Sequence, residues 1–330
     1  MRVVHTAIIV GSLFVLPAAA SAKNIVLSND DGLSSNIVAL YNALKAAGHD
    51  VIVSVPCENQ SGVGSAINLS TPQSRLTAPC RSDAAQIGAP IAGPITRKGI
   101  NGNDFYYVLG TPVMSLLYGV DVAAQKRWGR APDIVMSGPN EGQNLGSIIV
   151  NSGTVNVAES AALRGIPAIA LSGSAASADD KTLANPESAK IAALSVKFLD
   201  HLLSLAGSGP VLPAGLVLNV NFPNTLEGAT WKSTRVGTYN AYAFGYAANV
   251  AASASPMMLK MAKEHDMPLP SGPGVSIALN TAPPTADQAD DESVVNRKDI
   301  TVSPLQAGFQ APALEGVTGW LTSGMNPGAK

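Results

Sequence analysis

Two neighbouring carboxylates follow a short apolar segment near the start of the sequence. Asp30 and Asp31 come after residues 25–27, with Asn29 before them and Gly32 after them. Charge at the end of a buried strand is costly unless it is paired or bound, so the pair indicates a cation site. Asn-Asp-Asp-Gly is also typical of an ordinary turn, and the neighbouring segments must decide between the two interpretations.

Two further apolar segments, 50–56 and 132–138, are also followed by hydroxyl, amide or glycine residues. The carboxyl ends of parallel strands share one edge of a sheet, where ligands bind, so we expect these residues to lie near the two carboxylates. They are Ser61, Gly62, Asn140 and Asn144. A set of oxygen donors without His or Cys suits Mg²⁺, Mn²⁺ or Ca²⁺ rather than Zn²⁺ or Cu²⁺.

Residues 151–154 read NSGT and open a predicted helix. The N–H groups of Ser152, Gly153 and Thr154, with two hydroxyls, can meet an anion at the positive end of that helix. Either hydroxyl alone is also typical of a simple helix cap. A cation site and an anion site on the same sheet edge together predict a phosphoryl substrate.

β-branched runs alternate with amphipathic stretches through most of the chain. Strands are predicted at 24–28, 50–56, 104–110, 132–138, 167–173 and 215–223, and helices at 36–48, 112–125, 154–165 and 186–205. This alternation predicts a doubly wound α/β core with a mostly parallel sheet over residues 23–224. Residues 225–330 are expected to form extended arms and hairpins, with a last strand at 299–305.

Composition and motifs exclude several classes of function. The formal net charge of −2 provides no basic face for a nucleic-acid duplex or an anionic membrane. The sequence contains no G-x-x-x-x-G-K-[ST], no H-E-x-x-H and no G-x-S-x-G. It therefore does not support a triphosphate-binding P-loop, a zinc protease site or the nucleophile elbow of an α/β-hydrolase.

The N-terminus and the cysteines indicate an exported protein. Residues 1–22 combine Arg2, an apolar run at 7–15 and an A-x-A pattern that ends at Ala22, which is typical of a signal peptide. We therefore expect a periplasmic or secreted protein. Cys57 and Cys80 are the only cysteines, and a disulfide is expected in such a compartment. A metal site or a catalytic thiol is the alternative, although C-x-x-C spacing is missing.

Four segments carry a family resemblance: NIVLSNDDG, SVPCENQSGVGS, DIVMSGPNEGQNLGSIIVNSGT and LVLNVNFP. In this order they resemble the signature blocks of the SurE family of metal-dependent nucleotidases and acid phosphatases. The resemblance implies a Rossmann-like three-layer α/β/α core and a C-terminal arm that completes a homodimer or homotetramer. The implied ligands of one divalent cation, Mg²⁺ or Mn²⁺, are Asp30, Asp31, Ser61 and Asn140. The implied phosphate-binding residues are Ser152, Gly153 and Thr154, and we add Asn29, Gly62 and Asn144 to the predicted substrate site.

The predicted function is hydrolysis of phosphomonoesters, with nucleoside 5'- or 3'-monophosphates as the substrates that the resemblance implies. Asp30 and Asp31 are the predicted catalytic residues, and either a water or one of these carboxylates attacks phosphorus. Pro139 and Asn151 depart from the family pattern, as does the segment 291–305, which lacks a Gly-Tyr pair. The alternatives are therefore an exported nucleotide- or phosphate-binding protein and an interaction protein built on a degenerate nucleotidase core.

Overall fold

The computed structural model describes residues 22–70, 73–256, 258–259, 262 and 268–309. Residues 1–21 of the predicted signal peptide lie outside this part. Within it, no helix is long and apolar enough to cross a membrane.

Helices and strands alternate along the chain, with short 3-10 or π-helical turns (η) between some of them. Their order is β1 (Asn24–Ser28), α1 (Ser35–Ala46), β2 (Asp50–Pro56), η1 (Arg81–Asp83), β3 (Ala92–Pro94), β4 (Phe105–Val108), α2 (Pro112–Tyr118), η2 (Gly119–Ala123), α3 (Ala124–Trp128), β5 (Ile134–Glu141), η3 (Gly146–Val150), α4 (Gly153–Leu163), β6 (Ala168–Gly173), η4 (Ala175–Ser177), α5 (Pro186–Ala206), β7 (Leu216–Asn221), β8 (Trp231–Ser233), β9 (Tyr242–Ala247), β10 (Gly274–Leu279), η5 (Ala286–Gln288), α7 (Glu292–Val295) and β11 (Ile300–Gln306).

A nine-stranded sheet forms the centre of the protein, in the order β3-β4-β2-β1-β5-β6-β7-β11-β8. The run from β4 to β7 is parallel, while β3 and β11 pair antiparallel with β4 and β7. The predicted doubly wound, mostly parallel α/β core is therefore confirmed. Because β2, β1 and β5 are neighbours, the loops that follow them meet at one edge.

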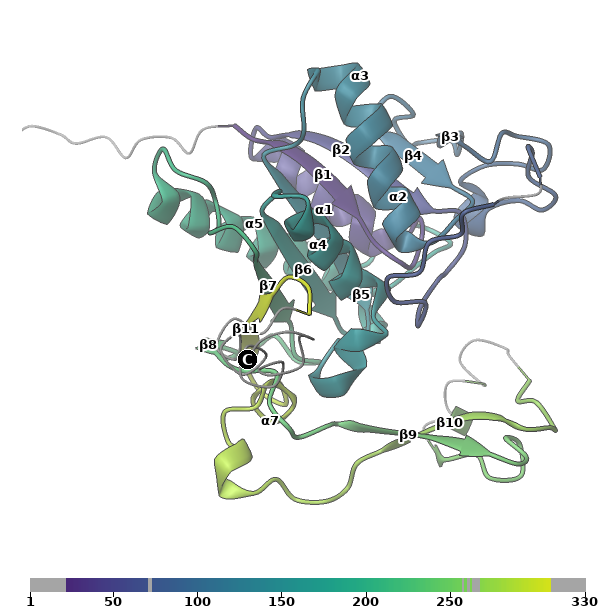
Figure 1. Ribbon diagram of the computed structural model, residues 1–330, viewed down its shortest axis with the longest axis vertical. Helices are drawn as coiled ribbons and strands as arrows, with labels where there is room; N and C mark the ends of the chain where they lie inside the picture. The colour runs from purple at the N-terminus through teal and green to yellow at the C-terminus, as the bar shows by residue number, and fades with distance from the viewer. Residues whose placement is uncertain (1–21, 71–72, 257, 260–261, 263–267, 310–330) are drawn as a thin grey trace, which may run out of the picture.

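Helices cover both faces of the sheet (Figure 1). Successive side chains of a strand point to opposite faces, and β1 shows this pattern. Ile25 and Leu27 pack into the apolar cluster with α1 and α5. Val26 packs into a second cluster with residues of α2 and α4. Both faces of the sheet are therefore buried, as its near-continuous apolar strands require.

Two predicted elements differ from the structure. The strand predicted at 132–138 continues to Glu141, because a register shift after Ser137 lets Asn140 pair again with Ser172 of β6. Asn140 therefore lies in the strand and not in a turn after it. The helix predicted at 112–125 is divided into α2, the π-helical turn η2 and α3.

A two-stranded arm extends away from the core after residue 241 (Figure 1). Its strands β9 and β10 pair antiparallel with each other, with Leu279 opposite Tyr242. Phe244 and Tyr246 are 52% and 76% exposed on this arm. The arm thus presents aromatic side chains that the core does not cover.

Candidate active site

Three elements bring predicted site residues together at the carboxyl edge of the sheet. Asp30 follows β1, Asn140 lies near the end of β5, and Thr154 is in the first turn of α4. Thr154 Oγ1 donates to Asp30 Oδ1 at 2.6 Å and lies 3.0 Å from Asn140 Oδ1. The structure therefore brings these three predicted residues together.

The cluster contains more acceptor oxygens than protons. The amide of Asn140 is oriented by its Nδ2, which donates to the Gly142 carbonyl at 2.7 Å, so its Oδ1 faces the hydroxyl of Thr154. A hydroxyl has one proton, yet Thr154 lies between two acceptors. This excess of oxygen lone pairs is an environment that a hard cation satisfies.

The N-terminus of α4 is packed tightly against Asp30. A Cβ at Gly153 would lie 2.6 Å from Asp30 Cβ and 2.8 Å from Pro112 Cγ, so only glycine allows this approach. Burial raises the pKa of Asp30, and hydrogen bonds from the Thr154 hydroxyl and from the N–H groups of Gly153 and Thr154 oppose that rise. The predicted anion-binding end of α4 therefore already meets one carboxylate of the protein.

Asp31 is equally buried, at 1% exposure, but has different partners. Its Oδ2 accepts from the Glu141 N–H at 3.1 Å, and its Oδ1 accepts from Asn59 Nδ2 at 3.4 Å. Burial raises its pKa well above the usual range, and the negative charges of Glu141 and Asp30 raise it further, whereas Arg81 opposes them. Two buried carboxylates side by side are costly when ionised, so a divalent cation is the natural counter-charge.

Arg81 joins this site although the sequence did not point to it. Its guanidinium donates to the Asp31 carbonyl, to Glu141 at 2.9 and 3.0 Å, and to Asp180 at 2.9 Å through Nε. Burial would lower the pKa of Arg81, but the carboxylates of Glu141 and Asp180 raise it more. Burial also raises the pKa of Glu141, which Arg81 opposes.

A disulfide holds Arg81 near β2. Cys57 and Cys80 are bonded, with their sulfur atoms 2.02 Å apart, and the Arg81 N–H donates to the Cys57 carbonyl at 2.8 Å. Adjacency to Asn140 was a signal that could have identified Glu141. Nothing in the sequence marked Arg81 except its place after a cysteine.

The remaining predicted residues have separate positions. Asn29 closes the turn, because its side chain bonds both backbone groups of Gly32 at 2.8 and 3.1 Å. Ser152 caps α4 by accepting from the Val155 N–H at 3.1 Å. Asn144 is buried and donates to Ser172 Oγ at 2.9 Å, and no hydrogen bond among the described residues joins its side chain to Asp30.

Ser61 and Gly62 lie in the exposed loop after β2. The loop reaches the site through its backbone, since the Gln60 N–H donates to the Asp30 carbonyl at 2.8 Å. No hydrogen bond among the described residues joins the Ser61 hydroxyl to Asp30, Asp31 or Asn140; its N–H bonds Asn59 Oδ1 at 2.8 Å.

The residues at this edge fit a divalent cation through oxygen donors. In the described part of the chain, no group of three or more His, Cys, Asp or Glu forms a metal cluster. The predicted ligands include only two carboxylates, and the amide of Asn140 supplies a further oxygen to the same cluster. This donor set suits Mg²⁺ or Mn²⁺ and not a soft metal.

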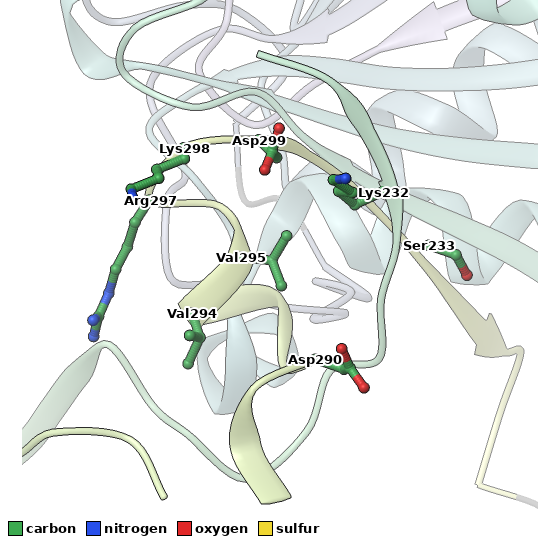
Figure 2. A pocket seen from close by; sticks show the side chains of 8 residues that line it. All are labelled: Lys232, Ser233, Asp290, Val294, Val295, Arg297, Lys298 and Asp299. Carbon is green, nitrogen blue, oxygen red and sulfur yellow. The ribbon is translucent and has the colours of Figure 1, made fainter. Parts of the chain in front are cut away.

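A cavity of about 530 Å³ lies elsewhere, between β8 and α7 (Figure 2). Strand β8 is five strand spacings from β1, which corresponds to about 24 Å. Figure 2 shows the cationic ends of Lys232, Lys298 and Arg297 apart from one another. The cationic groups of this cavity therefore do not converge on one point, and the cavity is remote from Asp30 and Asp31.

The fold and the site define a Rossmann-like α/β protein with an acidic, oxygen-lined site at the carboxyl edge of its sheet. A family model described as "Survival protein SurE" matches residues 25–243, more than half of the chain. The chain belongs to the SurE family.

Known proteins that are similar to this chain include a curated acid phosphatase and a SurE protein of solved structure. An acid phosphatase from Yarrowia lipolytica (strain CLIB 122 / E 150) is 35% identical over 215 residues, which are 63% of this chain and 59% of the relative. The crystal structure of a SurE protein from Aquifex aeolicus has a TM-score of 0.62 and 26% identity, and covers 91% of this chain and 100% of that chain. The chain thus matches 59% of the length of its curated relative.

Proposed function

We propose that this protein is a phosphomonoester hydrolase whose reaction occurs at Asp30, Asp31, Asn140 and Thr154. The observation that carries the proposal is the position of the Thr154 hydroxyl between Asp30 and Asn140. Membership of the SurE family and the similarity to a curated acid phosphatase support the same reaction.

Asp30, Asp31 and Asn140, with Ser61 from the adjacent loop, would hold one Mg²⁺ or Mn²⁺. When bound, the ion would neutralise phosphoryl oxygens and make a water more acidic. The carboxylates and the amide are fixed in place by their own hydrogen bonds, so the ligands need little rearrangement to act.

The N-terminus of α4 would help to bind the phosphate. The N–H groups of Gly153 and Thr154 already meet a carboxylate of Asp30, and the same positive end favours phosphoryl oxygens. The nucleophile is either a water oriented by a carboxylate or the carboxylate of Asp30 or Asp31 itself. In the second case an aspartyl-phosphate would form and then be hydrolysed.

We infer nucleoside 5'- or 3'-monophosphates as the main substrates, with broad acid-phosphatase-like specificity. The resemblance of the sequence blocks to metal-dependent nucleotidases supports this inference. The second candidate is a protein that binds a nucleotide without turning it over. The two buried carboxylates weigh against it, because binding an anion needs no acidic pair.

The deciding experiment measures phosphate release from nucleoside monophosphates and p-nitrophenyl phosphate, with and without a chelator. We expect release that chelation abolishes and that Mg²⁺ or Mn²⁺ restores. Asp31→Asn should remove it, whereas Asp121→Asn, a surface variant in a pair with Arg164, should not. Binding of nucleotide without release would favour the second candidate, and release that survives both chelation and Asp31→Asn would refute the proposal.

We also propose that the protein is exported and that it self-associates as a homodimer or homotetramer. The composition of residues 1–22 supports export. The aromatic side chains Phe244 and Tyr246 on the extended arm support self-association. Light scattering of the mature protein tests the second point, because a monomer at micromolar concentration would contradict it.

A further inference from the structure

A second, polar cavity lies where the arm joins the core. Its volume is about 260 Å³, just below the usual range for small-ligand pockets and so sized for a part of a ligand. The core contributes Gln143 and Asn224, which follow β5 and β7, and the arm contributes Tyr242 and Leu279. Asn296, just after α7, forms a further part of the wall.

The walls of this cavity offer unused hydrogen-bonding groups of both kinds. Gln143 Nε2 donates to Asn224 Oδ1 at 2.9 Å and to the Phe222 carbonyl at 3.0 Å. Across the described residues, Gln143 Oε1 accepts no hydrogen bond and Asn224 Nδ2 donates none. Asn296 Nδ2 donates to the Asn221 carbonyl at 2.9 Å, while its Oδ1 has no partner in that part of the chain.

A buried hydroxyl in the same wall is also without a partner. Ser293 is 3% exposed and lines the cavity. Its Oγ makes no hydrogen bond to any residue that the structure describes. A buried polar atom without a partner costs free energy, so this hydroxyl is a reason to expect a polar ligand.

Apolar and aromatic faces complete the cavity. Leu145 is 6% exposed and lies on the core side, and the ring of Tyr242 lies on the arm side. Burial raises the pKa of Tyr242, so its hydroxyl stays protonated and can donate. Flat faces combined with amide donors and acceptors match a planar ring with heteroatoms at its edge.

The cavity is connected to the carboxylate site by a short stretch of chain. Gln143 follows Asn140 by three residues, so their Cα atoms are at most about 11 Å apart. A sugar ring and a base extend over a distance of that order. This short separation fits one ligand that has its phosphate beside Asn140 and its other end beside Gln143.

We propose that this cavity binds the base of a nucleoside monophosphate whose phosphate is held at Asp30 and Thr154. The inference rests on the phosphomonoesterase proposed above, because only that reaction requires a leaving group there. Residues of the arm thus contribute to substrate recognition in the same chain.

The first test compares two tyrosines of the same strand. Tyr242→Ala removes the ring from the cavity, and Tyr246→Ala removes a ring that is 76% exposed and outside it. The substrates are AMP and ribose 5-phosphate, which has the phosphate and sugar without the base. Tyr242→Ala should raise the KM for AMP about tenfold, the order of loss when an aromatic partner of a base is truncated.

The controls separate base recognition from general damage. The kcat of Tyr242→Ala and its KM for ribose 5-phosphate should stay at wild-type values. Tyr242→Phe keeps the ring and loses only the hydroxyl, so its KM for AMP should rise less than that of Tyr242→Ala. Tyr246→Ala should leave both KM values at the wild-type level. An equal rise of both KM values in Tyr242→Ala, or no rise for AMP, would overturn the inference.

The second test needs no turnover. Binding of adenosine, guanosine, cytidine and uridine to the wild-type protein is measured by calorimetry and repeated with Tyr242→Ala. Binding that this variant loses and Tyr246→Ala keeps supports the base site even when no phosphate is released, in which case the proposed hydrolysis alone fails. Absence of binding for all four nucleosides at millimolar concentration overturns the base site even when phosphate is released.

Discussion

Glu292 permits a quantitative prediction because it is a carboxylate with no exposed surface. It accepts from the Gly146 N–H at 2.8 Å and from Asn219 Nδ2 at 3.1 Å. Burial raises its pKa from the usual 4.5 to about 6, Asp291 adds to the rise, and the hydrogen bonds oppose it. This difference corresponds to about 2 kcal/mol.

The sign follows from the direction of the shift. A carboxyl whose pKa is raised in the folded state binds its proton more tightly there than in the unfolded chain. The stability that this proton supplies is fully present below pH 4.5 and is lost as the pH rises through about 6. Glu292→Gln keeps a neutral side chain at every pH, so the unfolding free energy of this variant does not contain this pH-dependent decrease.

The assay is urea unfolding of the wild type and of Glu292→Gln, monitored by circular dichroism at several pH values from about pH 4 to about pH 7.5. The unfolding free energy of the wild type minus that of the variant should fall by about 2 kcal/mol over this range. Any constant offset from altered hydrogen bonding cancels. Ser293→Ala, a neutral change at the next residue, should give a difference independent of pH. A difference for Glu292→Gln that is flat, or that rises with pH, would refute the reasoning.

Three further predictions concern the site. Gly153→Ala places a Cβ 2.6 Å from Asp30 Cβ and should lower the unfolding free energy by about 1–3 kcal/mol in urea; an unchanged midpoint would contradict the packing. Thr154→Val removes the hydroxyl that lies between Asp30 Oδ1 and Asn140 Oδ1 and should slow phosphate release about 100-fold, whereas Thr154→Ser should retain most activity. Equal rates for the two variants would contradict this role. Arg81→Met leaves Glu141 without its cation and should cost about 3 kcal/mol on unfolding; a stabilised variant would contradict the ion pair.

The core and the centre of the site were predictable because their signals are local. The alternation of strands and helices fixes a parallel sheet, and the carboxyl ends of neighbouring parallel strands must share an edge. Asp30 and Asn140 follow from that rule, since each lies at such an end, whereas Thr154 follows from the helix start predicted at residues 151–154. The rule also selected Asn144, but in the structure the side chain of Asn144 donates to Ser172. The rule places residues at an edge of the sheet and does not say where their side chains point within a loop.

Arg81 and the polar cavity were not predictable from local signals. Arg81 reaches Asp31 from a loop whose path depends on long-range contacts, including the Cys57–Cys80 bond. The cavity joins Gln143 to Tyr242 and Asn296, which are far apart in the sequence. Only the folded arm and sheet bring such residues together.

The central claim is that Asp30 and a divalent cation act together in phosphate release. The most direct test removes metal from the wild type and from Asp30→Asn, adds Mn²⁺ stepwise, and follows both bound Mn²⁺ by electron paramagnetic resonance and the rate of phosphate release from AMP. The wild type should bind one ion per chain and regain its rate in parallel, while Asp30→Asn should bind weakly and stay inactive. A metal-free wild type that releases phosphate at its full rate, or an Asp30→Asn variant that regains it, would contradict the claim.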